Sequence, residues 1–311
     1  MKKLAIAVAL CTAFACSALL AAAGPALATY PGATNGRLAF AATIDGNTDV
    51  YSALADGQAP RRLTDQPSFD ACPAYSPDGK WIAWCSFDSP VGAGPGGIWL
   101  MKQNGTKKHQ LTGFGTFPDI SPDETKLVFT GAPSGSTNVD IWLVDVDGSN
   151  LTRLTTAQGQ DQFPAWSPDG SKIVFESIRT GIKQVWLMNA DGTNQQQLTF
   201  DAAPKDQLPD WKPDGAQIAY VARTTAPSGG DIWIINADGS NPHAITTGAD
   251  KLGAAWSPDG SEIATVDFPT RVVEILPAAG GDAHAVHPGG IQFVPGWQPR
   301  GVGDEATDDQ D

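Results

Sequence analysis

The sequence predicts an all-β fold, a six-bladed β-propeller of four-stranded antiparallel blades, because of two repeating motifs. The first is a hairpin centred on Ser-Pro-Asp-Gly or a close variant, which recurs every 45 or 46 residues. The second is an apolar strand, then Asn-Gly or Asp-Gly, then a short strand that ends in Leu-Thr or Ile-Thr. Together they supply four strands per repeat, and four strands in about 45 residues are typical of a propeller blade.

The first motif is explained by the conformational preferences of its turn residues. In one copy Pro168 fixes φ for the first central position of a type I turn, Asp169 suits the second, and Gly170 accepts the positive φ that follows. Aromatic and β-branched residues flank the turn, as strands require. Copies lie at 73–84, 118–129, 164–175, 209–220 and 254–265. Each copy supplies the two inner strands of a blade, which we name A and B from the axis outward.

The second motif supplies the two outer strands of a blade, C and D. Asn-Gly and Asp-Gly are the favoured dipeptides for a two-residue hairpin turn, so the chain should reverse there. Copies lie at 97–112, 140–155, 184–199 and 231–246. In the last repeat strand C is weaker, at 271–276, and Gly280 and Gly281 stand at its turn.

The two ends of the repeat region complete one further blade. Strands B, C and D are supplied by 35–40, 49–54 and 61–64, with no strand A before them. Residues 293–299 supply a strand A with nothing after it, and Trp297 holds the position that Trp166 holds in its own repeat. Pairing the last strand with the first three closes the ring into six blades and leaves no unpaired sheet edge.

The segments outside the repeats suggest export. Lys2 and Lys3 precede an alanine-rich apolar run, and Ala-Leu-Ala fits a cleavage site, so residues 1–28 are interpreted as a secretory signal peptide. The alternative interpretation of this run is a transmembrane anchor. The remaining segments are the linker 29–35, the propeller 36–300 and the tail 301–311. The acidic tail has no apolar content to bury and is expected to be disordered.

The net charge excludes some classes of binding partner, and the cysteine content raises the question of a disulfide. The formal net charge of −14 argues against nucleic acid and against an anionic membrane surface, so no membrane insertion is expected after signal cleavage. Only Cys72 and Cys85 remain in the mature chain, where export favours a disulfide. A hairpin register that pairs Ser76 with Trp81 places the two cysteines opposite each other, and a register that pairs Ser76 with Lys80 does not. The sequence leaves a disulfide and two free thiols both open.

The repeating unit resembles the WD40-like repeat of the TolB β-propeller family, on the residues Trp-Ser-Pro-Asp-Gly, Ile-Trp, Asn-Ala-Asp-Gly and Leu-Thr. The resemblance covers almost the whole mature chain and at least five of the six blades. It implies a protein like that of the Tol–Pal cell-envelope system, where a small α/β domain precedes the propeller. Here about seven residues separate the cleavage site from the first strand, so we expect that domain to be absent. A stand-alone periplasmic or extracellular propeller is therefore predicted.

Enzymatic alternatives find less support in the residues. The chain has no Gly-x-Ser-x-Gly nucleophile motif and no length for a hydrolase domain. Its histidines fall in or next to outer D strands of three repeats, away from the axis, so neither a metal nor another cofactor is expected. The stretch 145–150 looks like part of a calcium loop but stands where a C–D hairpin turn is required. The alternative function is an exported hydrolase or lyase that acts on carbohydrate through acidic channel residues.

The candidate binding site is the mouth of the central channel. Counting five residues back from each strand A aromatic or apolar position gives the start of the innermost strand, where Asp70, Asp161, Asp206 and Lys251 stand. Arg179 and Arg223, on neighbouring B–C loops, would frame this mouth and hold carboxylates of a partner. The competing interpretation is that each aspartate caps its own loop. The function predicted is non-enzymatic: a monomer that binds a protein or peptide partner at this face.

Overall fold

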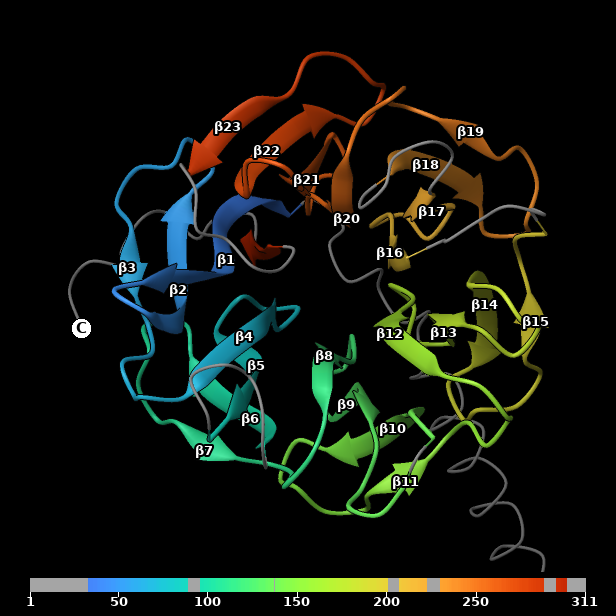
Figure 1. The fold of residues 1–311 in the computed structure, drawn as a ribbon, viewed down its shortest axis with the longest axis horizontal. Helices are drawn as coiled ribbons and strands as arrows, with labels where there is room; N and C mark the ends of the chain where they lie inside the picture. The colour runs from blue at the N-terminus through green and yellow to red at the C-terminus, as the bar shows by residue number, and fades with distance from the viewer. Residues whose placement is uncertain are drawn as a thin grey trace, which may run out of the picture.

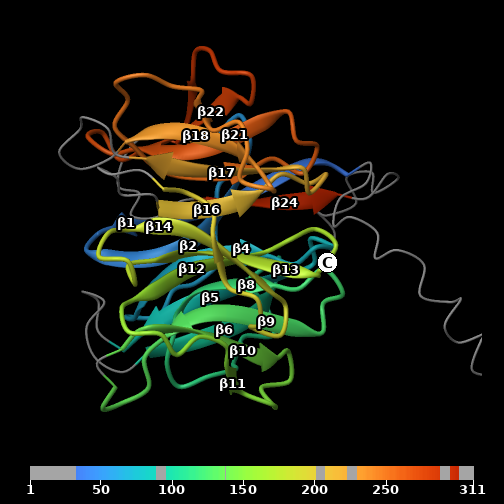
Figure 2. The same ribbon diagram turned by 90° about the vertical axis from the view of Figure 1, so that its right-hand side faces the viewer.

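The computed structural model describes residues 33–88, 96–136, 138–200, 207–222, 230–287 and 295–300, and it contains six four-stranded antiparallel sheets arranged in a ring (Figure 1). In the side view the ring axis lies horizontally, and the inner strands β16 and β24 run along it (Figure 2). This confirms the predicted propeller. The predicted signal peptide and acidic tail lie outside the described residues. Within the described part no helix is long and apolar enough to cross a bilayer.

The blades follow one another around the ring in chain order, and each has its strand A nearest the axis. Blade 1 consists of β24 (Gly296–Arg300), β1 (Thr34–Ile44), β2 (Asn47–Leu54) and β3 (Arg61–Arg62). Blade 2 consists of β4 (Phe69–Tyr75), β5 (Trp81–Phe87), β6 (Gly96–Lys102) and β7 (His109–Gln110). Blade 3 consists of β8 (Thr116–Ile120), β9 (Lys126–Gly131), β10 (Asp140–Asp145) and β11 (Thr152–Arg153).

The second half of the ring repeats the same order. Blade 4 consists of β12 (Asp161–Trp166), β13 (Lys172–Ser177), β14 (Gln184–Asn189) and β15 (Gln196–Gln197). Blade 5 consists of β16 (Gln207–Trp211), β17 (Gln217–Ala222), β18 (Asp231–Asn236) and β19 (His243–Ala244). Blade 6 consists of β20 (Lys251–Trp256), β21 (Glu262–Asp267), β22 (Val272–Pro277) and β23 (His284–His287).

The ring closes through the composite blade that the sequence predicts. β24 pairs with β1, with Trp297 opposite Leu38. Trp297 is buried, and its indole N–H donates to the carbonyl of Ala255 in blade 6 at 3.2 Å. A Cβ on Gly36 would lie 2.6 Å from the carbonyl oxygen of Gln298, so only glycine allows β24 to approach this closely. The last strand is therefore an integral part of the fold.

Each Ser-Pro-Asp-Gly turn is held by its own side chains. In blade 4 the Ser167 hydroxyl donates to Asp169 Oδ1 at 2.6 Å and accepts the backbone N–H of Lys172 at 2.9 Å. Asp169 Oδ1 also accepts the backbone N–H of Ser171 at 3.0 Å. The same serine–aspartate bond forms at Asp78, Asp123 and Asp259. These bonds explain why the motif repeats with so little change.

The Leu-Thr ending of the second motif also has a structural cause. In blade 4 the Thr199 hydroxyl accepts the backbone N–H of Val185 at 2.9 Å and donates to Gln184 Oε1 at 2.7 Å. The equivalent threonines Thr64, Thr112, Thr155 and Thr246 accept the same kind of bond. Strand D pairs with strand C through two residues in most blades, so this hydroxyl adds a needed attachment.

A β-bulge interrupts each innermost strand of blades 2 to 6. The register shifts within β4, β8, β12, β16 and β20, and a residue with left-handed φ lies in each bulge. These residues are Cys72, Phe117, Phe163, Leu208 and Gly253. A bulge adds one unpaired residue and bends the strand. Here it interrupts the inner strands of blades 2 to 6 at equivalent positions of the repeat.

The strand A tryptophans pack between blades. Trp166 belongs to one apolar cluster with Val128 and Ile141 of blade 3, and Trp211 contacts the cluster that includes Val174 of blade 4. Both indoles are buried. Large flat side chains bury much area in such wedge-shaped seams. The main role of these tryptophans is therefore to pack the hydrophobic core between neighbouring blades.

Candidate functional site

Mainly apolar residues of the inner strands line the central channel at the level of the bulges. A cavity of about 150 Å³ lies there, lined by inner-strand residues of blades 2 to 6. The bulge residues Cys72, Phe117, Phe163 and Leu208 line it, together with the proline that follows each of them. The rings of Phe117 and Phe163 meet edge to face, with centroids 4.4 Å apart. We call these residues the channel waist.

Two carboxyl groups, Asp119 and Asp210, line the waist from alternate blades. Each stands one residue before the last residue of its strand A, where blades 2, 4 and 6 have alanine. Asp119 Oδ2 accepts the backbone N–H of Trp166 in blade 4 at 2.7 Å. Asp210 Oδ2 likewise accepts the N–H of Trp256 in blade 6 at 2.8 Å. Both therefore connect neighbouring blades while part of each residue stays accessible from the channel.

The surroundings of these two carboxyl groups raise their pKa values. Burial raises the pKa of Asp119 to about 7, although two backbone N–H groups favour the charged form. Burial also raises the pKa of Asp210 to about 7, and the negative charge of Asp119 adds to this increase. Within the described residues neither group forms an ion pair. A cation that enters the waist would therefore find two acidic groups without a charged partner.

At the mouth, by contrast, Asp161 is paired within the protein. Arg179 Nη2 lies 2.7 Å from Asp161 Oδ2, and the Asp161 side chain is fully buried. The other guanidinium nitrogens donate to Gln195 Oε1 at 2.6 Å and to Ser177 Oγ at 2.9 Å, and the group stacks on the Trp186 ring at 4.6 Å. Each of the three guanidinium nitrogens of Arg179 therefore has a partner within the protein, and contact between Arg179 and a partner protein stays a prediction.

Lys251 and Asp70 are also satisfied by their neighbours. Lys251 Nζ lies 2.6 Å from Glu274 Oε2 and 3.1 Å from Asp267 Oδ1. Burial disfavours the charged lysine, but the hydrogen bonds with Glu274 and Asp267 outweigh it and raise the Lys251 pKa. Asp70 is buried and accepts the hydroxyl of Ser68 at 3.1 Å, as a loop cap does. The structure thus brings Asp70, Asp161 and Lys251 to one end of the channel, where each side chain already has a partner within the protein.

The last two predicted mouth residues, Asp206 and Arg223, lie outside the described residues. One pair that the sequence did not reveal lies at the mouth of blade 4, where Lys183 Nζ contacts Glu176 Oε1 at 2.8 Å. Burial raises the pKa of Glu176 to about 7 against the favourable charge of Lys183. No motif marks Glu176, because it replaces a threonine or hydrophobic residue of other B strands at a position that varies.

The two cysteines lie together beside the waist. Ser76 N–H donates to Trp81 O, which is the register that would place Cys72 opposite Cys85. The bulge then shifts the pairing, so that Ala71 stands opposite Cys85 instead. Both cysteines are buried free thiols, and burial followed by the neighbouring Cys72 raises the pKa of Cys85. The disulfide stays a prediction for the exported protein.

The other candidate ligands behave as surface and turn residues. His109 and His243 are exposed on the outer strands β7 and β19. In the calcium-like stretch, Asp147 Oδ1 accepts the backbone N–H of Ser149 at 2.9 Å, which is a turn interaction. Among the described residues no group of three or more histidine, cysteine, aspartate or glutamate side chains is arranged to hold a metal ion.

Comparison with known proteins finds similarity to TolB propellers. The TolB beta propeller domain family matches residues 100–229. An uncharacterised protein of Agrobacterium fabrum is 33% identical over 165 residues, which cover 49% of this chain and 54% of that protein. A TolB homolog of Chlorobium luteolum is 32% identical over 165 residues, which cover 51% of this chain and 35% of that protein. The match thus spans about half or less of the length of these curated relatives.

The crystal structure of TolB from Acinetobacter baumannii shares the fold. It superposes with a TM-score of 0.73 and 24% sequence identity, over 86% of this chain and 68% of that one. Closure of the ring by β24, the repeated turns and this superposition all agree. The described part of the chain is therefore a TolB-like β-propeller.

Proposed function

We propose that the protein is an exported, non-enzymatic binding or scaffold protein that receives a segment of a partner protein in its central channel. The observation that carries this proposal is the pair Asp119 and Asp210, accessible in an apolar waist and without a cationic partner among the described residues. A lysine or arginine side chain of the partner would supply the missing positive charge. The apolar wall around it would favour the aliphatic part of that side chain.

The mouth contributes a rigid frame in this proposal. Ion pairs such as Asp161–Arg179 hold the strand starts in place, so a partner segment meets a preformed opening. Asp206 and Arg223 are the mouth residues that we propose as additional contacts. The strongly acidic chain would also steer a basic partner towards this face.

The location follows from the amino-terminal sequence and from the relatives. The charged and then apolar start of the chain supports export, and the relatives named TolB support a role related to the Tol–Pal envelope system. We therefore propose a monomer in the periplasm or extracellular space that binds protein and requires no cofactor.

Site-specific photo-crosslinking tests this proposal. A small diazirine amino acid replaces Ala255, which lines the waist, and the control variant carries it at exposed Gln196 on the outer strand β15. Both variants are irradiated in intact cells of the source organism, and the adducts are identified by mass spectrometry. We expect one recurrent protein partner from position 255 only. Asp119→Asn combined with Asp210→Asn should reduce that adduct at least tenfold.

Two results would contradict the proposal. One is an absence of protein adducts at position 255 while the folded variant is exported normally. The other is turnover of an acidic oligosaccharide by the purified protein that the double Asp→Asn change abolishes, because this would make the waist a catalytic site.

A further inference from the structure

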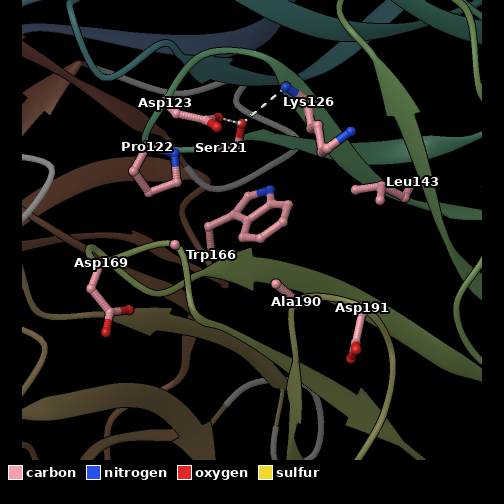
Figure 3. Close-up of a pocket in the computed structure, with 10 residues that line it drawn as sticks. Ser121, Pro122, Asp123, Lys126, Leu143, Trp166, Asp169, Ala190 and Asp191 are labelled. Carbon is pink, nitrogen blue, oxygen red and sulfur yellow. Dashed lines mark hydrogen bonds between the residues drawn. The ribbon is translucent and has the colours of Figure 1, made fainter. Parts of the chain in front are cut away.

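A second concave site lies in the seam between blades 3 and 4, at the end of the channel opposite the mouth. Its volume is about 600 Å³, within the range of about 300–1,000 Å³ that is usual for ligand sites. Figure 3 shows the Trp166 indole between the Ser121–Pro122 turn of blade 3 and Ala190 of blade 4. We call this site the turn-side groove. Asp161 and Trp166 are the two ends of β12, so the groove lies roughly 16 Å from the mouth.

A small side chain forms the outer wall of the groove. Blade 4 places Ala190 there, and the corresponding wall of the seam between blades 2 and 3 is Val146. That seam also ends in Ile120 where this one has Trp166, and its cavity is about 240 Å³. Leu143 remains partly exposed on the floor of the turn-side groove. The resulting surface is largely apolar.

The rim of the groove carries uncompensated negative charge. Asp123, Asp169 and Asp191 come from three different turns. Burial opposes ionisation of Asp123 and Asp169, but hydrogen bonds within their turns outweigh it and lower both pKa values, and turn hydrogen bonds also lower the pKa of Asp191. Lys126 is the one cation among the described residues that line the groove, and its Nζ lies 2.7 Å from Asp145 Oδ1. In other blades the equivalent turn aspartates Asp78 and Asp214 each pair with a lysine. Within the described residues the three rim aspartates of this groove form no such pair.

The groove also contains a hydrogen-bond donor without an acceptor. Trp166 is 8% exposed, and its Nε1–H has no partner among the described residues. The indole N–H groups of Trp211 and Trp256 also lack an acceptor among the described residues, so the unpaired donor is a common feature of the repeat. Trp166 differs because an open groove with aspartates on its rim lies beside it. A ligand that suits the site has an acceptor, an apolar group and a positive charge.

We propose that the turn-side groove binds a basic peptide segment of a partner protein. An apolar side chain of the segment rests on Trp166 and Leu143, a main-chain carbonyl accepts the indole N–H after a small shift, and lysine or arginine side chains face Asp123 and Asp191. A second copy of this chain does not fit, because its net charge of −14 would repel the rim. This site is independent of the channel and of the function proposed for it.

The test measures binding of a defined probe at Trp166 itself. The protein is labelled with 5-fluorotryptophan, and the Trp166 resonance is assigned with Trp166→Phe. The probe is a hexapeptide of alternating lysine and leucine, and the control peptide has glutamate in place of lysine. We expect a saturable shift of the Trp166 resonance with the lysine peptide, weakened at least threefold by 0.5 M salt and absent with the glutamate peptide.

Matched variants separate this groove from other surfaces. Ala190→Val copies the residue that blade 3 carries, so it should fold, and it should weaken binding at least fivefold, as should Asp191→Asn. Ala237→Val in the next seam should leave binding unchanged, and so should Asp210→Asn, whose side chain accepts the backbone N–H of Trp256 in blade 6. No saturable shift at millimolar peptide, equal binding by Ala190→Val, or a shift produced instead by a neutral oligosaccharide would each overturn the proposal.

Discussion

At the mouth of the channel Asp161 is paired with Arg179, and Lys251 with Asp267 and Glu274. At the waist, among the described residues, Asp119 and Asp210 accept hydrogen bonds from backbone N–H groups and have no cation beside them. Buried charges with partners mainly hold a structure together, whereas buried acids without them can respond to a ligand or to pH. The difference teaches that Asp161 and Lys251 at the mouth are held by ion pairs, whereas the two carboxyl groups without a cation lie deeper in the channel.

Removing the strand that closes the ring should have the largest effect, because it should disrupt both the mouth and the waist of the channel. Deleting residues 288–311 removes β24, and with it the buried Trp297 and the partner strand of β1. Blade 1 would then expose a sheet edge and its apolar face. We expect loss of cooperative unfolding in urea and aggregation, whereas deletion of 301–311 alone should change little. Equal unfolding curves for the two truncations would show that the closure is not needed.

Removing the mouth partner should be the next largest effect. Arg179→Ala leaves the fully buried Asp161 without its counter-charge, and such a change costs about 3–5 kcal/mol of unfolding free energy. The double variant Arg179→Ala with Asp161→Asn should recover much of this loss, since no buried charge remains. Urea unfolding at pH 7 measures both. A single variant as stable as the parent would remove the distinction between mouth and waist.

The two waist carboxyl groups should instead make the free energy of unfolding depend on pH. In the unfolded chain both carboxyl groups titrate near their ordinary pKa of 3.8, while in the folded protein the pKa values are about 7. Between roughly pH 4 and 7 the native state therefore holds protons that the unfolded state has lost, so stability falls as pH rises through this window. Asp119→Asn with Asp210→Asn should remove the share of this decrease that the two groups cause, on the order of 5 kcal/mol between pH 5 and 8. An unchanged slope in the double variant would argue against raised pKa values.

Formation of a disulfide between Cys72 and Cys85, beside the channel waist, is the smallest effect that we expect. In exported protein the neighbouring Cys72 and Cys85 should form one disulfide, because the compartment is oxidising and the thiols are adjacent. Counting thiols in denatured, unreduced protein should find none, with Cys72→Ser plus Cys85→Ser as the blank. Two free thiols would exclude the bridge.

The fold could be predicted from sequence because its signals are local and repeated. Turn dipeptides, the Ser-Pro-Asp-Gly hairpin and the unmatched end strands suffice for six blades and their closure. Even the level of the strand starts could be predicted, since Asp161 and Lys251 do begin β12 and β20.

The state of the site residues could not be predicted in the same way. The pairing of Arg179 with Asp161 depends on how a B–C loop folds back over strand A, which no motif specifies. The waist acids were missed because the count along strand A took no account of the bulge, although a proline follows the bulge residue in four of the five bulged strands. A usable signal did exist: aspartate at 119 and 210 where the other complete repeats have alanine at 74, 165 and 255.

Direct titration of the aspartate side chains tests the contrast between mouth and waist most directly. Carbon-13 NMR of aspartate carboxyl groups, recorded from pH 3 to 9, should show two resonances that titrate near pH 7. Both should disappear in Asp119→Asn with Asp210→Asn and persist in Arg179→Ala. If every aspartate of the folded protein titrated below pH 5, or if the late resonances survived the double change, the waist would be as structurally neutralised as the mouth and the contrast would be wrong.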